Sequence, residues 1–361
     1  MLALDPVGHT CAMPLPRTLE DFRRTFIMME TEGLEGYVDG GSGRGITAVR
    51  NVEAWEAVEL LPHVLAGSGT PDTSASLLGV TDQFPLLVAP TGFQEYVYPD
   101  GGRAVPRACA AAGVRYTHST FATSGFADLA AIDDLSWWFQ LYVFTDKGLN
   151  RALMAKAAEA GASAVVMTVD LAVLGQRDRD LHTGFSLRGR NIVPCAAEAG
   201  APDTRLAPLW ASLDHDLSWE TLSTVIAESP LPVIVKGLIR ADDACQALDL
   251  GAAGVIVSNH GGRQLDTAAA TARALPAVVD AVAGRGAVLV DGGIRSGLDV
   301  AKAIALGADA ALVGRAPLWG LGVGGEPGVA AVLRILQEEF QRSMTLLGAR
   351  TTADLTRDLL Y

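Results

Sequence analysis

Nine consecutive residues, Ser258 to Asp266 (Ser-Asn-His-Gly-Gly-Arg-Gln-Leu-Asp), combine the residue types needed for acid–base chemistry on an anionic ligand. The imidazole of His260 is a base that can titrate near neutral pH. The guanidinium of Arg263 is a forked cation that fits a carboxylate. The two glycines between them let the backbone bend and approach a ligand closely. The stretch therefore predicts a base and an anion clamp in one short loop.

Two further glycine and arginine sets point to a phosphate group. Asp291, Gly293 and Arg295 follow one apolar run, and Gly314 and Arg315 follow the next. Phosphate sites in (β/α)8 barrels are commonly built from two consecutive loops of this kind. No Gly-x-Gly-x-x-Gly string opens a strand–helix–strand unit, so the sequence gives no support for a dinucleotide site.

Polar residues also end three other apolar runs. Lys236 follows Val-Ile-Val, where a solvated surface charge is hard to explain. Gln140 and Tyr142 are two residues apart, as are Thr168 and Asp170. Because side chains alternate along a strand, each pair is expected on one face, pointing into the mouth of a barrel.

Short apolar runs alternate with alanine- and leucine-rich stretches that end in glycine, which indicates repeated strand–helix units. Eight such units favour a closed α/β barrel over an open doubly wound sheet. The expected helices include 149–161, 241–251, 298–307 and a final amphipathic helix near 330–346. The expected strands are 86–90, 115–118, 139–143, 164–169, 233–236, 254–258, 288–290 and 310–313.

Two regions fall outside this alternation. Residues 1–80 are expected to form an N-terminal extension, with a short helix at Leu19–Met29 and a glycine-rich loop at 36–43. Residues 171–217 contain no convincing strand and carry several cations, Arg188 and Arg190 among them. Long connections in compact domains are usually functional, so we expect a partly mobile loop over the active site. The whole chain, 1–361, is then one domain.

Composition narrows the class of protein. The chain has 361 residues, 49% of them hydrophobic and 19% charged, as expected of a globular protein with a large core. Its net charge of −13 makes nucleic acid and anionic membranes poor partners. Four scattered cysteines predict reduced thiols in a cytoplasm rather than disulfides or a metal site. Neither a secretory signal nor an apolar run of membrane-spanning length is visible.

The string from Ser258 to Asp266 closely resembles the active-site motif of the FMN-dependent 2-hydroxy acid oxidases and dehydrogenases. The resemblance runs from about Tyr37 to Arg315; the family's usual leading helices cannot be placed in the first thirty residues. It implies a single FMN-binding (β/α)8 domain that oxidises an (S)-2-hydroxy acid to the 2-oxo acid. Electrons would pass to oxygen or another acceptor, and the protein would be a homotetramer.

The resemblance also implies individual roles. His260 would be the base, paired with Asp170, and Tyr142 would hydrogen-bond the substrate hydroxyl. Tyr37 and Arg177 would hold the substrate carboxylate together with Arg263. Lys236 would stabilise negative charge on the reduced flavin ring. The flavin-binding set would comprise Pro90, Thr91, Gly92, Ser119, Gln140, Thr168, Lys236, Ser258, Asp291, Gly293, Arg295, Gly314 and Arg315.

Two positions bear on the substrate side chain. Gly92 stands where glycolate oxidases resembling this chain carry alanine, and Phe121 stands where they carry tryptophan. Phe93 follows Gly92 directly. A wider pocket with aromatic walls favours a phenyl ring over a methyl group. We therefore expect mandelate or 4-hydroxymandelate as substrate, with lactate or glycolate as the alternative.

Two other classes remain to be weighed. An FMN barrel without net redox chemistry, such as an isomerase, would lack the paired arginines Arg177 and Arg263. A non-catalytic flavin-binding protein would not need His260 and Asp170. Whether His260 takes the α-hydrogen as a proton or the hydroxyl proton during hydride transfer is left open by the sequence.

Overall fold

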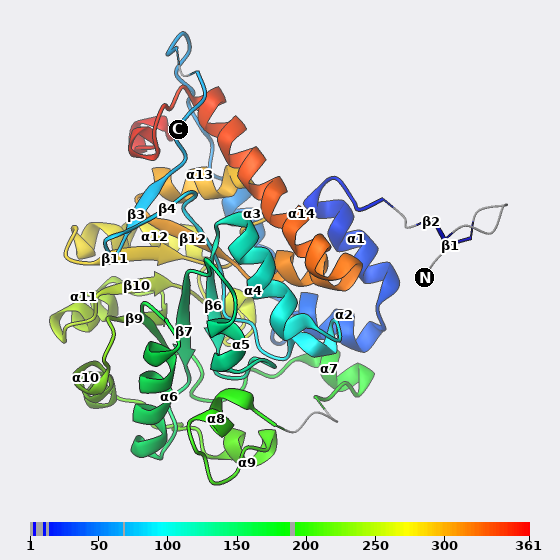
Figure 1. The fold of residues 1–361 in the computed structure, drawn as a ribbon. Coiled ribbons are helices and arrows are strands. Elements are labelled where there is room, and N and C mark those ends of the chain that lie inside the picture. The colour runs from blue at the N-terminus through cyan, green and yellow to red at the C-terminus, as the bar shows by residue number, and fades with distance from the viewer. Residues whose placement is uncertain (1–2, 5–9, 12–13, 68, 188–191) are drawn as a thin grey trace.

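A closed barrel of eight parallel strands forms the centre of the computed structural model, which describes residues 3–4, 10–11, 14–67, 69–187 and 192–361. The strands run in chain order around the barrel, and the last pairs with the first (Figure 1). All eight predicted strands are confirmed. Their bounds are β5 Leu86–Val88, β6 Arg115–Ser119, β7 Trp137–Leu141, β8 Val165–Thr168, β9 Val233–Leu238, β10 Gly254–Val257, β11 Ala287–Val290 and β12 Ala310–Val313.

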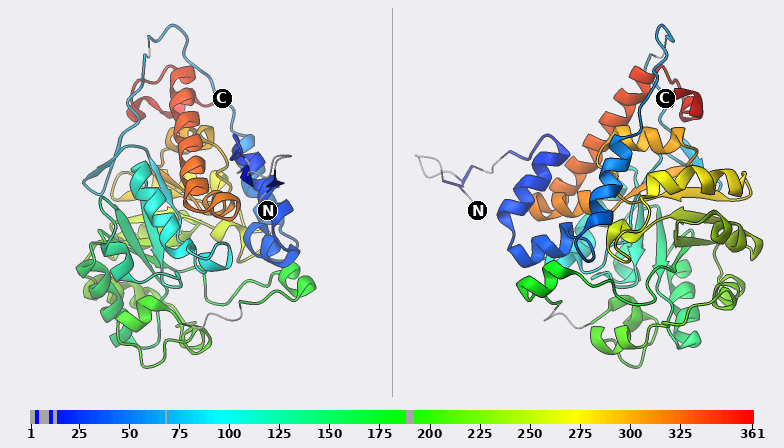
Figure 2. Two further views of the ribbon diagram at one scale, coloured as in Figure 1. Left: turned by 45° about the vertical axis from the view of Figure 1, so that its right-hand side comes forward. Right: turned by 180° about the vertical axis from the view of Figure 1, so that it is seen from behind.

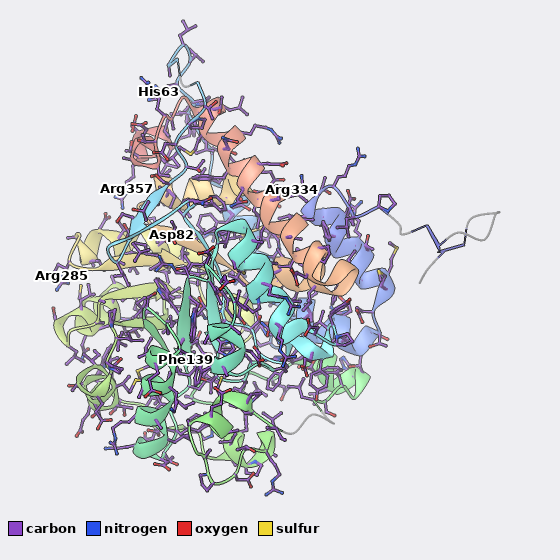
Figure 3. All side chains as sticks on the ribbon, viewed as in Figure 1. His63, Asp82, Phe139, Arg285, Arg334 and Arg357 are labelled. Atoms are coloured by element: carbon purple, nitrogen blue, oxygen red, sulfur yellow. The ribbon has the colours of Figure 1, made fainter. Side chains whose placement is uncertain are left out.

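The interior of the barrel is a packed core rather than a channel. Apolar side chains from the strands, with Trp138 the largest, form one buried cluster. The hairpin of β3 (Ala75–Leu77) and β4 (Val80–Asp82) adds Leu77 to this cluster. Asp82, labelled in Figure 3, forms a buried ion pair with Arg115 at 2.9 Å, and Arg115 lies 5.0 Å from the Trp138 ring centroid. The carboxyl ends of the strands, beyond this cluster, are therefore free to carry polar side chains.

Helices surround the barrel because each buries one apolar face against the strands (Figure 1). Several begin at a side-chain cap, such as Asp146, Ser218 and Ser296. They are α4 Gly101–Ala112, α5 Phe126–Ala130, α6 Lys147–Glu159, α10 Trp219–Glu228, α11 Ala241–Asp249, α12 Thr271–Val282, α13 Gly297–Ala305 and α14 Arg315–Leu347.

The last helix is longer than the sequence indicated. The prediction covered residues 330–346, whereas α14 begins directly after β12. Its first part is separated from the second by non-helical backbone at Gly324 and Gly325, with φ of 60° at Gly325. The break is close to Pro327, and this concentration of helix-breaking residues concealed the first part.

The N-terminal extension contains three helices, α1 Leu19–Met29, α2 Glu32–Asp39 and α3 Ile46–Glu56. The helix at 19–29 is confirmed, and it packs against α14 (Figure 2). The predicted loop at 36–43 is wrong in its first half, because α2 continues to Asp39. Thr31 caps α2 by accepting a hydrogen bond from Leu34, and acidic side chains in the first turn favour the helix despite Gly36.

The described residues of 171–217 contain no strand, as predicted, but they form three short helices. These are α7 Asp178–Thr183, α8 Pro194–Glu198 and α9 Leu206–Ala211. Arg188 and Arg190 lie outside the described residues. In the part of the chain that the structure describes, no helix is both long and apolar enough to cross a membrane.

Candidate active site

One large cavity, of about 470 Å³, lies at the carboxyl ends of the barrel strands. Most of the predicted site residues line it, although they come from every part of the chain. They are Tyr37, Pro90, Thr91, Gly92, Ser119, Phe121, Tyr142, Arg177, Lys236, His260, Arg263, Asp291, Gly293, Arg295, Gly314 and Arg315.

Four predicted residues support this wall from behind instead of lining it: Gln140, Thr168, Asp170 and Ser258. Gln140 accepts a hydrogen bond from Ser119 at 3.1 Å and donates one to Thr168 at 3.1 Å. This buried chain of polar side chains connects the ends of β6, β7 and β8. Each of the three side chains has a hydrogen-bond partner in this chain, and the bond to Gln140 holds Ser119 in place.

His260 is held against a carboxylate. Its Nδ1 lies 2.9 Å from Oδ1 of Asp170, which follows β8. Burial on its own raises the pKa of the Asp170 carboxyl, but His260 and Lys236 outweigh burial and lower its net pKa below the usual value. The ionised carboxylate can therefore orient the imidazole and stabilise its protonated form.

The backbone around His260 is bent to bring the imidazole to the cavity. His260 has φ of 57°, a conformation uncommon for a residue with a side chain. Gly262 has φ of 77°, and a Cβ there would lie 2.4 Å from the Ala48 amide nitrogen at the start of α3. Asn259 caps this turn by accepting a hydrogen bond from Gly262 at 3.1 Å. Glycine is thus required by both conformation and close approach to α3.

Lys236 lies at the bottom of the cavity and is nearly fully buried. Its Nζ is 3.2 Å from Oδ2 of Asp291 and donates to the Ser258 hydroxyl at 3.0 Å. Burial lowers the pKa of Lys236, but Asp291 and Asp170 outweigh this effect and raise it above the usual value. The ammonium group therefore stays charged. The other oxygen of Asp291, Oδ1, is buried without a hydrogen-bond partner in the described structure.

A group of partly buried arginines faces the cavity. Arg263 and Arg315 donate to the last carbonyls of α2: Arg263 to Tyr37 at 2.6 Å, and Arg315 to Val38 at 3.1 Å and Gly40 at 2.7 Å. These carbonyls carry the negative end of the helix dipole, which favours the cations.

The same arginines have no carboxylate within ion-pair distance among the described residues, and neither does Arg295. Burial, and then the Arg177 guanidinium, lowers the pKa of Arg263 to about 9. Burial, and then Arg295, lowers the pKa of Arg315 to about 10. A guanidinium remains protonated near neutral pH, so the cavity carries positive charge that an anionic ligand would neutralise.

Two arginines converge on one tyrosine. The guanidinium carbons of Arg177 and Arg263 lie 5.2 Å and 5.1 Å from the ring centroid of Tyr37. Arg177 sits 3.7 Å from Asp180, and its Nε has no hydrogen-bond partner in the described structure. Phe185 packs on the same tyrosine, with ring centroids 5.1 Å apart. Tyr37, Arg177 and Arg263 therefore form a compact cationic group that can bind a carboxylate.

Another part of the cavity wall is aromatic. Phe121 packs on Phe93 at 5.9 Å, on Tyr142 at 5.6 Å and on Trp210 at 5.2 Å between ring centroids. A Cβ at Gly92 would lie 3.1 Å from the Phe121 carbonyl oxygen and 3.3 Å from the Phe121 Cβ. Glycine at position 92 therefore leaves space beside Phe121. Burial raises the pKa of Tyr142 well above the usual value, which keeps its hydroxyl protonated as a donor.

Sequence reasoning missed several residues that complete the site. Trp210, Leu206 and Ala207 reach the cavity from α9, inside the segment predicted only as a covering loop. Trp55 of α3 donates to the Gly292 carbonyl at 2.8 Å and so fixes the loop after β11. Nothing local identifies these residues. For Trp210, Leu206 and Ala207 the one signal is the length of the 171–217 connection, and for Trp55 the sequence offers none.

The comparisons with known proteins agree with this geometry. The family model for FMN-dependent dehydrogenases matches residues 30–361. An L-lactate oxidase of Nostoc sp. is 40% identical over 90% of this chain and 92% of its own length. Glycolate oxidase 1 of Oryza sativa subsp. indica is 39% identical over 90% of each chain. The chain belongs to the FMN-dependent dehydrogenase family.

Solved structures of a mandelate oxidase superpose closely on this fold. One, with (S)-2-phenylpropionate, has a TM-score of 0.86 at 37% identity and covers 96% of this chain and 98% of its own. Another, with benzoyl-formic acid, gives a TM-score of 0.87. The protein is an FMN-dependent enzyme that oxidises 2-hydroxy acids.

The cavity fits FMN in charge and in free acceptors. Arg295 and Arg315, which have no ion-pair partner among the described residues, lie in the loops after β11 and β12 that the sequence predicted to bind phosphate. Asp291 Oδ1, a buried acceptor without a partner in the described structure, can receive a ligand hydroxyl. Lys236 brings a buried positive charge that matches a ring gaining electrons.

Proposed function

We propose that this enzyme oxidises an aromatic (S)-2-hydroxy acid of the mandelate or 4-hydroxymandelate type. The observation that carries the proposal is the aromatic wall of Phe93, Phe121 and Trp210 beside the compact cationic group. A phenyl ring gains several times the transfer free energy of a methyl group in such a site. The mandelate oxidase neighbours support the same substrate class.

The cationic side chains orient the substrate. Arg177 and Arg263, with Tyr37, hold the carboxylate, and the protonated hydroxyl of Tyr142 hydrogen-bonds the substrate hydroxyl. Two guanidiniums on one carboxylate fix both its position and its plane. The substrate side chain then extends toward Phe121.

Proton transfer is the task of His260. Its Nδ1 is engaged by Asp170, so the other ring nitrogen is available to accept a proton from the substrate. The ionised Asp170 favours the protonated imidazole that results. FMN, when bound, takes up the two electrons of the oxidation. Lys236 holds positive charge where negative charge then develops.

The remaining assignments extend this proposal to the whole chain. FMN would be held by Pro90–Gly92, by the polar chain through Ser119, Gln140 and Thr168, and by Lys236 with Ser258. Asp291 would accept a hydrogen bond from an FMN hydroxyl, and Gly293, Arg295, Gly314 and Arg315 would hold the phosphate end. Residues 1–361 form one FMN-binding domain in which 1–80 extend the barrel and 171–217 cover the active site. The protein works in the cytoplasm as a homotetramer and passes electrons to oxygen or another acceptor.

Oxidation of lactate or glycolate is the second candidate, because relatives that carry those names are as similar in sequence. Anaerobic mixing of the yellow holoenzyme with a panel of (S)-2-hydroxy acids separates the two. We expect mandelate and 4-hydroxymandelate to bleach the flavin with higher kcat/KM than lactate or glycolate. A panel led by lactate or glycolate overturns the substrate class and leaves the reaction type intact. Reoxidation by air, compared with an artificial acceptor, then identifies the acceptor.

A further inference from the structure

The helix α8 and its flanking residues form a closed loop, residues 192–205, directly before α9. Val193 donates to the Thr204 carbonyl at 2.8 Å, and Ile192 and Arg205 form an antiparallel bridge at the base of the loop. α9 begins at the next residue, Leu206, and carries Trp210 to the cavity. Any shift of the closed loop is therefore passed directly to Trp210.

The Glu198 side chain, from the end of α8, ties this closed loop to the start of α5. One carboxylate oxygen accepts hydrogen bonds from the amides of Phe126 at 2.8 Å and Ala127 at 3.3 Å. These are free amides of a helix N-terminus, which favour a carboxylate. A Cβ at Gly125 would lie 2.0 Å from the other carboxylate oxygen, so glycine is what allows the approach.

A second contact joins the same two segments. The Sγ atom of Cys195, in α8, lies 3.2 Å from Nε2 of the buried His118 of β6 and 3.6 Å from the Ser124 carbonyl oxygen. Cys195 and His118 are both fully buried. The closed loop is thus fixed to the β6–α5 connection by one buried contact and by one charged contact nearer the surface.

The β6–α5 connection also carries the other half of the aromatic wall. Phe121 lies four residues before Gly125 and packs on Trp210. After α9 the chain is tied to the residues that follow β7, through Thr145 N to Ser212 O at 2.9 Å and Asp214 N to Val143 O at 2.8 Å. Both rings of the Phe121–Trp210 pair are therefore placed by segments that Glu198 joins.

We infer that Glu198 is a positioning residue for the side-chain subsite: it fixes the spacing of Phe121 and Trp210 and thereby sets the preference for an aromatic substrate. This inference rests on the proposed function. Glu198 does not line the cavity, so its loss should act on the fit of the substrate ring and not on proton transfer. The free energy lost with one helix-capping interaction corresponds to about a fivefold change in the binding constant of the substrate.

The first test compares four variants. Glu198→Ala removes the carboxylate, and Gly125→Ala displaces it with a methyl group. Glu198→Gln keeps an oxygen acceptor for the two amides. Asp128→Ala is the matched control, because Asp128, within α5, caps the same helix by accepting a hydrogen bond from the Gly125 amide at 3.0 Å; its ion-pair partner, Arg103, also lies outside the closed loop.

For Glu198→Ala and Gly125→Ala we expect the KM for mandelate to rise about fivefold, with kcat and the constants for lactate little changed. Glu198→Gln should retain most of the wild-type preference, and Asp128→Ala should leave the mandelate-to-lactate ratio unchanged. All four should keep their flavin. If Asp128→Ala lowers the ratio as much as Glu198→Ala, fraying of α5 explains the effect and the inference fails.

A double-mutant cycle tests whether Glu198 acts through Trp210. In a Trp210→Ala background, Glu198→Ala should no longer change the mandelate-to-lactate ratio, because the ring it positions is gone. Additive effects overturn the inference. A wild-type enzyme that prefers lactate counts against the proposed substrate class, whereas an unchanged ratio in Glu198→Ala counts against Glu198. The two failures are therefore told apart.

Discussion

The cavity is built from two halves of the barrel rim that are constructed differently. The charged half comes from the ends of β8 to β12 and the loops after them, and it carries Arg177, Lys236, His260, Arg263, Arg295 and Arg315. The aromatic half follows β5 to β7 and consists of Phe93, Phe121 and Tyr142, completed by Trp210 of α9.

The charged half is set mainly by short hydrogen bonds to nearby strand ends and to the last turn of α2. The aromatic half depends on ring packing and on a segment that crosses from beyond β8. Under the proposed function, the groups that carry the chemistry lie close to the strand ends, whereas the wall that would contact the substrate side chain depends on a segment from outside the barrel strands.

Removal of the base should produce the largest effect. His260→Ala should retain FMN but reduce the rate of flavin reduction by at least about a hundredfold, the contribution typical of a positioned acid–base group. Rapid-mixing spectroscopy under anaerobic conditions measures this rate. Wild-type reduction rates in the variant would contradict the role of His260.

Replacement of the guanidinium fork should follow. Arg263→Lys keeps a positive charge but loses the bidentate contact and the bonds to the Tyr37 and Gly40 carbonyls. We expect kcat/KM to fall between about tenfold and about a hundredfold for mandelate and lactate alike, as for loss of a charged hydrogen bond. Steady-state kinetics with both substrates provide the measurement. An unchanged kcat/KM would contradict the role of Arg263 in holding the substrate carboxylate.

Flavin retention should separate two arginines of similar burial. Arg315→Ala should weaken FMN binding by about tenfold or more, whereas Arg177→Ala should leave it nearly unchanged. The flavin released on denaturation should be FMN. Ultrafiltration of the holoenzyme followed by absorbance gives both answers. Release of FAD, or equal loss from the two variants, would argue against a phosphate site at Arg315.

The charged half was largely predictable from sequence because its residues stand in short strings at strand ends. His260 and Arg263 lie within one motif, and Arg315 follows β12 directly. The strands themselves were predictable because buried parallel strands are short apolar runs. A motif at a strand end is therefore enough to predict a residue's place in the site, because the barrel itself brings the strand ends together.

The aromatic half and α2 show where such reasoning ends. Trp210 lies in a segment without regular periodicity, and only its packing against Phe121 gives it a role. Tyr37 was placed in a loop because glycines surround it, yet the Thr31 cap and the acidic first turn extend α2 through it. Such positions depend on packing between segments that are far apart in the sequence. This packing cannot be read from the types of the neighbouring residues.

Mild acid should destabilise the fold through His118, which contacts Cys195 of the closed loop before α9. Burial lowers the pKa of His118 from 6.5 to about 3, so the folded protein keeps this imidazole neutral while the unfolded chain binds a proton. The resulting stability is present above about pH 6.5 and is lost progressively as the pH falls toward about 3. The melting temperature of the wild type should drop more between pH 7 and pH 4.5 than that of His118→Phe. Equal drops would contradict this.

The division of labour between the two halves is tested most directly by one ratio, kcat/KM for (S)-mandelate over kcat/KM for (S)-lactate. It should be measured side by side in the wild type, Trp210→Ala and Arg177→Ala. We predict that the ratio exceeds one in the wild type and falls several-fold in Trp210→Ala, because ring burial is lost. In Arg177→Ala both constants should fall together and the ratio should hold. A ratio that survives in Trp210→Ala, or collapses in Arg177→Ala, would contradict the account.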